Sequence, residues 1–252
     1  MREVLLAGKD ICREFQGNTG GMVLNHITLD IYAGDFTVIM GSSGAGKSTL
    51  LYALSGMDEI TGGEIWYKGR GISRFKEKQM SDLRTHEFGF VFQQTHLVSN
   101  LTLYENVVVA GYLGTGRKAK EVEQRADELL SQMGVEKAKG RLPSEVSGGE
   151  AQRAAVARAV INRPGILFAD EPTGALNRQN TQEVLNLLTS LNETGQSILM
   201  VTHDVRAAIR GSRILYLEDG KILDELNFPA YRDEAAKDRE IRLNEWLCAL
   251  SW

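Results

Sequence analysis

The chain has few of the residues that build disulfide or metal frameworks. It has only two cysteines, Cys12 and Cys248, in 252 residues. This count excludes a fold held together by several disulfides. The four histidines lie far apart in the sequence and lack the spacing of metal ligands; they are His26, His86, His96 and His203.

Long apolar runs are also missing. No stretch approaches the roughly 20 apolar residues that a helix needs to cross a bilayer. The segment 1–15 is interrupted by charged residues, so it lacks the apolar core of a signal peptide. We therefore expect a cytoplasmic protein whose membrane role, if it has one, comes through a partner.

An excess of positive charge is absent as well. Lys and Arg number 29 against 33 Asp and Glu, which gives a net charge of -4. Nucleic-acid-binding proteins usually carry a basic surface, so we predict no nucleic-acid partner. The hydrophobic share of 42% and charged share of 25% are typical of a globular protein. The length suits one large domain, or one domain with a subdomain.

Short apolar segments alternate with helical patterns, which favours an α/β fold. A helix is expected at 47–56, and a hairpin over 213–225 should turn at Asp219-Gly220, a pair suited to a tight turn. The predicted buried strands are FTVIM (36–40), EFGFVFQQ (87–94), PGILFADEP (164–172) and QSILMVTHD (196–204).

The middle of the chain, from about 100 to 161, has mainly helical patterns. Apolar residues of 119–134 recur at helical spacing, and Gly134 ends that segment. The one strand expected there is the short NVVVA (106–110). We interpret this region as a helical subdomain inserted between two strands of the α/β core.

The loop GSSGAGKS (41–48) fits the pattern G-x-x-x-x-G-K-[ST] and lies between a predicted strand and a predicted helix, as this phosphate-binding motif requires. Its backbone N–H groups can surround a phosphate at the positive end of the helix. Lys47 would reach the β- and γ-phosphates, and Ser48 would bind Mg²⁺. The predicted nucleotide-binding residues here are Gly41, Ser42, Ser43, Gly44, Ala45, Gly46, Lys47, Ser48 and Thr49.

Polar residues end three of the predicted strands. Asp170 and Glu171 follow an apolar strand; Asp170 suits the surroundings of Mg²⁺, and Glu171 suits the base that activates water. Gln93 could bind Mg²⁺ or hold the water, and His203 could contact the γ-phosphate or Glu171. Strand ends at one edge of an α/β sheet converge, so we predict one catalytic site from Glu171, His203 and Gln93, with Ser48, Gln93 and Asp170 around the metal.

The stretch VSGGE (146–150) opens another helix. Ser147 can cap this helix, with Glu150 in the capping-box position. Taken alone, the stretch indicates only a well-capped helix. Because Gly148 and Gly149 also suit a phosphate site, it raises the alternative of a second phosphate cradle.

Taken together and in this order, the loop 41–48, Gln93, VSGGE, ILFADE (166–171) and His203 resemble the ATP-binding subunit of ABC transporters. The resemblance covers about residues 2–224 and implies a P-loop NTPase core, with a RecA-like sheet, flanking helices and an N-terminal antiparallel β part. It implies an ABC ATPase domain over 1–224 (core 1–93 and 162–224, helical subdomain about 94–161) and a C-terminal helical tail over 225–252.

The resemblance also assigns roles across a dimer. Ser147, Gly148, Gly149 and Glu150 would contact ATP held by a second copy of the chain, so that two copies enclose two ATP with Mg²⁺. Phe15 would stack on adenine, although a place in the core is the rival interpretation. Asn177, in PTGALN (172–177), stands where most of the family has Asp, which puts coupling across the dimer in doubt.

The motifs look most like the branch of macrolide exporters, lipoprotein-releasing systems and bacitracin-type peptide-resistance transporters. There the ATPase powers a separate transmembrane permease and lies on the inner face of the membrane, and we expect export of, or resistance to, antimicrobial peptides or other amphiphiles. A soluble ABC ATPase acting on ribosomes or DNA is the alternative. The tail places Leu243, Trp246, Leu247 and Leu250 on one helical face, to pack on its own domain or on a partner.

Overall fold

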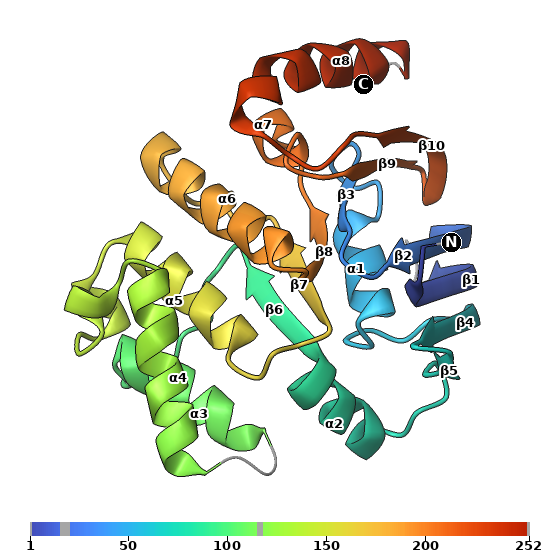
Figure 1. Cartoon of the computed structure of the whole chain (residues 1–252). Coiled ribbons are helices and arrows are strands. Elements are labelled where there is room, and N and C mark those ends of the chain that lie inside the picture. Colours follow the sequence, from blue (N-terminus) through green and yellow to red (C-terminus); the bar gives the residue numbers. More distant parts are fainter. Residues whose placement is uncertain (1, 16–20, 115–117, 251–252) are drawn as a thin grey trace. The chain divides into compact units, whose positions relative to one another are not determined.

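The computed structural model describes residues 2–15, 21–114 and 118–250. Contacts divide the chain into two compact units (Figure 1), a first unit of Met1–Met80 with Leu191–Trp252 and a second unit of Ser81–Ser190. The domain boundaries expected from the sequence stay a prediction. The last two residues of the expected tail, 251 and 252, lie outside the described residues.

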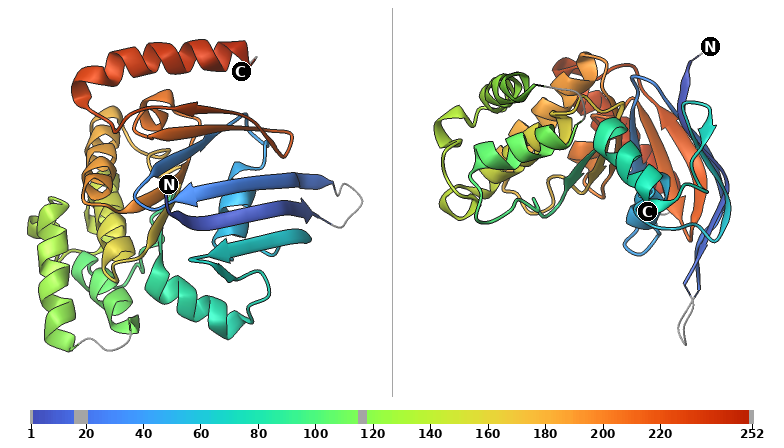
Figure 2. Two further views of the ribbon diagram at one scale, coloured as in Figure 1. Left: turned by 45° about the vertical axis from the view of Figure 1, so that its right-hand side comes forward. Right: turned by 90° about the horizontal axis from the view of Figure 1, so that it is seen from below.

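The first unit contains an antiparallel sheet with the strand order β2-β1-β4-β5 (Figure 2). In β1, Ala7 pairs with Asp30 of β2 on one side and with Trp66 of β4 on the other. This sheet confirms the predicted N-terminal antiparallel part. Its strands are β1 (Val4–Glu14), β2 (Met22–Tyr32), β4 (Gly62–Tyr67) and β5 (Arg70–Gly71).

The same unit holds a second run of strands in the order β10-β9-β3-β8. The central strand β3 is buried at all five residues and pairs in parallel with both β8 and β9. Asp219 (φ 46°) and Gly220 (φ 72°) make the expected turn of the β9–β10 hairpin. The elements are β3 (Phe36–Met40), β8 (Ser197–Val201), β9 (Arg213–Glu218), β10 (Lys221–Asn227), α1 (Lys47–Leu54) and α7 (Val205–Ala208).

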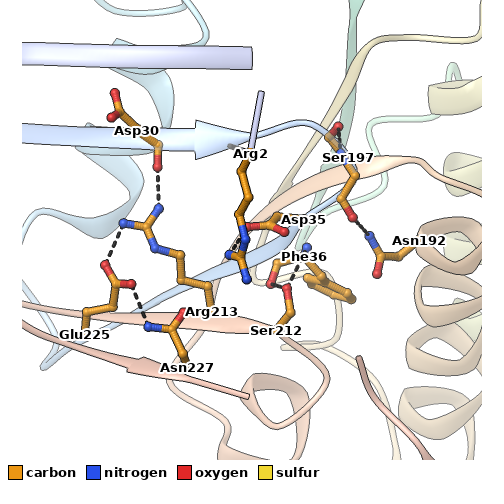
Figure 3. A network of polar contacts seen from close by, with 11 residues as sticks. Arg2, Asp30, Asp35, Phe36, Asn192, Ser197, Ser212, Arg213, Glu225 and Asn227 are labelled. Atoms are coloured by element: carbon orange, nitrogen blue, oxygen red, sulfur yellow. Dashed lines mark hydrogen bonds and ion pairs between the residues drawn. The ribbon is translucent and has the colours of Figure 1, made fainter. Parts of the chain in front are cut away.

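A buried arginine joins the two runs of strands (Figure 3). Arg213 of β9 donates to the backbone carbonyl of Asp30 on β2 and, at 2.6 Å, to the carboxylate of Glu225 on β10. The bond from Arg213 holds the pKa of Glu225 below its usual value. Because β9 pairs directly with β3, this link ties the antiparallel sheet to the strand that leads into the loop 41–48.

The tail folds as a short 3₁₀ turn η3 (Asp233–Ala235) and the helix α8 (Ala236–Ala249), which contacts α7. Leu243 and Leu247 are buried, so this face packs within the first unit. Arg239 is also buried and donates to the carbonyls of Pro229 and Gly211; desolvation lowers its pKa to about 10. Across the part of the chain that the structure describes, no helix combines the length and apolarity that a membrane span requires.

In the second unit, β6 (Phe88–Phe92) and β7 (Ile166–Asp170) form a parallel pair, and β7 is buried throughout. The other described elements of this unit are helices, as the sequence predicts for the middle of the chain. The helices, with α2 leading in from the first unit, are α2 (Glu77–Glu87), α3 (Leu103–Leu113), α4 (Ala119–Gln132), η1 (Glu136–Ala138), η2 (Pro143–Glu145), α5 (Gly148–Val160) and α6 (Arg178–Glu193).

The strand expected at 106–110 was wrong, because these residues lie within α3. Three consecutive valines favour a strand by local propensity. Thr102 overrides this preference as a helix cap: its hydroxyl accepts from the backbone N–H of Glu105, whose carboxylate accepts from the N–H of Thr102. Two of the valines, Val107 and Val108, are then buried on one helical face.

Candidate functional site

The loop 41–46 leads from β3 directly into the first turn of α1, as the phosphate-binding motif requires. Ser42, Ser43 and Gly44 are exposed, so this part of the loop is accessible to a ligand. Gly46 is the N-cap of α1 with φ 99°, a conformation that disfavours any residue with a Cβ. A Cβ there would also lie 2.9 Å from the carbonyl oxygen of Val23.

The ammonium of Lys47 lies over this loop. It donates to the carbonyl oxygens of Gly41 and Ser42 at 2.9 and 2.8 Å. Lys47, Ser48 and Thr49 are half-buried in the first turn of α1. A loop that offers backbone N–H groups, a helix N-terminus and a lysine is suited to bind the β- and γ-phosphates of a nucleotide.

His203 also belongs to the first unit. It follows β8, the strand that pairs with β3, and its side chain is exposed. Thr202 and Asp204 fix the backbone on either side: the Thr202 hydroxyl accepts from the N–H of Asp204, and Asp204 caps α7. The imidazole is therefore presented from a constrained turn at the end of a strand parallel to the one that precedes the loop 41–46.

Phe15, the residue expected at the adenine, is 44% exposed. This exposure argues against a place in the core. The guanidinium of Arg13 lies 4.5 Å from the centroid of the ring, and Asp58 holds that guanidinium at 2.7 Å. The ring is thus oriented while much of its surface stays accessible to a flat ligand.

Replacing Phe15 with alanine is expected to raise the KM for ATP without lowering the melting temperature. Stacking on a purine contributes roughly 1–3 kcal/mol by alanine substitution in nucleic-acid complexes. Met22→Ala, at a residue 48% exposed in the same unit, serves as the matched control. A large loss of thermal stability with unchanged nucleotide affinity would instead assign Phe15 a structural role.

In the second unit, Gln93 and Glu171 leave two paired strands at the same edge. Phe92 of β6 is in register with Asp170 of β7. Gln93 directly follows Phe92, and Glu171 directly follows Asp170. Asp170 is 9% exposed, whereas Gln93 is exposed. Gln93, Asp170 and Glu171 therefore lie at the same end of this pair of strands, and their roles stay a prediction.

Glu171 has an unusual backbone conformation for a glutamate, with φ 46°. Residues other than glycine, asparagine and aspartate adopt this left-handed region at a cost, and such strain is concentrated at functional sites. The carbonyl of Glu171 accepts from the N–H of Gly174, which closes a turn after β7. This turn directs Glu171 away from the course of its own strand.

Ser147 caps α5 by the capping box expected from the sequence. Its hydroxyl accepts from the backbone N–H of Glu150 at 3.2 Å, and the Glu150 carboxylate accepts from the Ser147 N–H at 2.8 Å. These bonds lower the pKa of Glu150. Ser147 and Gly148 are nevertheless exposed, so the cap leaves the start of the helix open to a ligand.

Packing against α6 is a reason for a glycine at position 149 that the sequence did not reveal. Gly149 is buried, and a Cβ there would come within 2.3 Å of the Asn180 side chain of α6. Any larger residue would therefore require the Asn180 side chain to move. The role expected of Gly149 at a phosphate stays a prediction.

Asn177 is the helix cap of α6. Its side-chain oxygen accepts from the backbone N–H of Asn180 at 2.9 Å. Asparagine and aspartate are about equally good at this task, so the uncommon residue leaves the local structure intact.

Two residues of α5 that the sequence analysis did not predict donate hydrogen bonds to backbone carbonyls at and after the end of β6. Gln152 donates to the carbonyls of Phe92 and Pro172, and Arg158 donates to those of Thr95 and His96. A lone glutamine among alanines and valines was the available signal for the first of these. The contacts of this glutamine could not be predicted, because they depend on which face of α5 is buried.

Comparisons with known proteins identify the family of the chain. The family model described as "ABC transporter" matches residues 24–174, more than half of the chain. The chain is 42% identical over 224 residues to the macrolide export ATP-binding/permease protein MacB of Pasteurella multocida, covering 88% of this chain and 34% of MacB. It thus spans about a third of the length of that relative.

Other relatives are similar over most of their own length. The lipoprotein-releasing system ATP-binding protein LolD of Aquifex aeolicus is 44% identical over 207 residues, covering 82% of this chain and 92% of LolD. The ATP-binding cassette MJ0796, solved as a dimer with ADP and Pi, is 34% identical with a TM-score of 0.83, covering 90% of this chain and all of that one. The predicted P-loop NTPase fold is confirmed, and the chain belongs to the ABC transporter family, as an ATP-binding ATPase of that family.

Proposed function

We propose that two copies of this chain enclose two ATP and use their hydrolysis to power a separate transmembrane permease. The observation that carries this proposal is the exposed loop 41–46 before α1, over which the ammonium of Lys47 lies. Such a loop binds the phosphates of ATP, with the nucleotide-binding residues expected from the sequence.

The second unit supplies the reacting groups. Glu171 takes the proton of a water whose oxygen attacks the γ-phosphorus; the bond to the β-phosphate oxygen breaks, and ADP and phosphate leave. Gln93 orients that water, since Gln93 and Glu171 follow paired residues of β6 and β7. His203 contacts the γ-phosphate from the end of β8.

The residues fit Mg²⁺ as the metal. This ion takes oxygen ligands and is usually held by one or two carboxylates together with the phosphates of the substrate. Ser48 offers a hydroxyl, Gln93 an amide oxygen and the largely buried Asp170 a carboxylate. When bound, Mg²⁺ neutralises charge that develops on the phosphates.

The dimer accounts for the exposed start of α5. Ser147 and Gly148, with Gly149 and Glu150 behind them, contact the γ-phosphate of ATP held by the other copy. A self-complementary arrangement of this kind gives two equal sites related by a two-fold axis. The relative MJ0796 was solved as a dimer, which supports the arrangement.

The relatives suggest what the ATPase drives. MacB is named for macrolide export and LolD for a lipoprotein-releasing system, and macrolides and lipoproteins are both amphiphilic molecules. We infer that the permease of this chain exports, or confers resistance to, antimicrobial peptides or other amphiphiles. The chain would then lie in the cytoplasm on the inner face of the membrane, without a nucleic-acid partner.

A pull-down tests this proposal against a soluble ABC ATPase acting on ribosomes or DNA. The tagged full chain with Glu171→Gln, held with ATP, should recover a protein with transmembrane segments from solubilised membranes. The same chain with Lys47→Ala, which should not bind ATP, controls for nucleotide-independent recovery. Recovery of ribosomes or DNA, with no membrane protein, would contradict the proposal.

A further inference from the structure

Gln152 is a buried polar residue on an otherwise apolar stretch of α5. Its side chain is 1% exposed, and its neighbours along the buried face are alanines and valines. A buried amide costs free energy unless its hydrogen-bonding groups find partners. Gln152 finds them: its Nε2 donates to the carbonyl oxygens of Phe92 and Pro172, each at 2.8 Å.

These two carbonyls flank the proposed catalytic pair. Phe92 ends β6 immediately before Gln93, and Pro172 comes immediately after Glu171. The amide group of glutamine has two N–H donors, and here each carbonyl takes one. Gln152 therefore connects the backbone just before Gln93 with the backbone just after Glu171.

The side chain of Gln93 lies against the turn that Glu171 begins. A Cβ added at Gly174, within this turn, would come within 3.0 Å of the Nε2 of Gln93. The N–H of Gly174 donates to the carbonyl of Glu171, so Gln93 lies beside a hydrogen-bonded turn. A small shift of either backbone segment would change the distance between the two side chains.

Arg158 strengthens the same attachment six residues further along α5. It donates to the carbonyls of His96 and Thr95 at 2.6 and 2.7 Å, beyond Gln93 in the chain. Its burial lowers its pKa through desolvation. The segment from Phe92 to His96 is thus held to α5 on both sides of Gln93.

We infer that Gln152 is a positioning residue for ATP hydrolysis: it sets the separation of Gln93 and Glu171 by holding both backbones to α5. This inference rests on the proposed function. Since α5 begins at Ser147, the same helix joins the proposed contact with the partner's ATP to the groups that act on water.

The test replaces Gln152 in the full chain by methionine, which has similar size and no amide donors, and by glutamate, which is isosteric. Methionine removes both N–H donors that Gln152 gives to the carbonyls of Phe92 and Pro172, and glutamate can replace them by at most one O–H donor. We expect kcat for ATP hydrolysis to fall about 10- to 100-fold, the scale of a misplacement of about 1 Å at a reacting centre. The KM for ATP should change less than about twofold, because the residues that bind the phosphates are untouched.

Amide hydrogen exchange supplies a readout that does not depend on activity. In both variants the amides of residues 92–96 and 173–174 should exchange faster than in the wild type, and those of the loop 41–46 should not. Gln124→Glu, at an exposed glutamine of α4 in the same unit, is the matched control and should change neither rate. All assays are run well below the melting temperature of each variant.

Unchanged kcat in both variants, or a loss of folding in both, would overturn the positioning role. Equal effects on kcat and KM would do so too, because they would point to general loosening. Absence of hydrolysis by the wild-type chain would contradict the proposed function itself, and the exchange measurement would still decide whether Gln152 fixes the two segments.

Discussion

Replacing Glu171 with glutamine should abolish most ATP hydrolysis while leaving ATP binding intact. Glutamine keeps the size and shape of the side chain, but it cannot accept the proton of the attacking water. General-base catalysis contributes about 10²–10⁴ in rate, and we expect a loss of that size. ATP should then remain bound, so the variant should accumulate as an ATP-bound dimer, measured by light scattering.

Glu128→Gln, at an exposed glutamate of α4, is the matched control for this change and should hydrolyse ATP normally. The left-handed backbone at Glu171 is a second reason to assign it a function, since a glycine would adopt φ 46° without strain. Turnover near the wild-type rate in Glu171→Gln would show that another group takes the proton.

Replacing Ser147 with arginine should be as damaging, for a different reason. The change puts a long cation at the positive end of α5 and removes the hydroxyl from the exposed start of the helix. We expect the homodimer to lose ATP-dependent trapping of nucleotide with a phosphate analogue. Binding of ATP to the isolated chain should persist, because Lys47 and the loop 41–46 are unchanged.

Thr102→Arg separates this loss from the loss of a helix cap. Thr102 and Glu105 form the same capping box at α3, with the same pair of reciprocal bonds. Both variants should lose a comparable amount of stability, about 0.5–2 kcal/mol for a lost cap. Only Ser147→Arg should lose the trapping of nucleotide. If the two variants trap the same amount of nucleotide, Ser147 acts only as a helix cap.

Local sequence motifs predicted the individual elements well. The loop 41–48, the hairpin turn at Asp219-Gly220 and the cap at Ser147 each depend on a few adjacent residues, and the structure contains all three. The strand expected at 106–110 failed, since local β propensity was weighed without the cap at Thr102. A capping box four residues earlier carried the better signal.

Features that depend on residues far apart in the sequence could not be predicted from it. Nothing near Gly149 in the sequence indicates that Asn180 will lie against it, and nothing near Gln152 indicates the carbonyls of Phe92 and Pro172. The exposure of Phe15 likewise follows from how the antiparallel sheet ends. Such features depend on how helices and strands pack, which the local motifs do not specify.

The direct test of the central claim mixes two inactive variants, Lys47→Ala and Ser147→Arg. In each homodimer both sites lack either Lys47 or Ser147, so neither homodimer should trap nucleotide. A mixed dimer has one site with both lesions and one site with an intact loop 41–46 facing an intact Ser147. If two copies of this chain enclose ATP as proposed, verified mixed dimers, with the permease present if it is needed for dimerisation, should trap nucleotide at about one site per dimer. Mixed dimers that trap no more than either parent would contradict the claim.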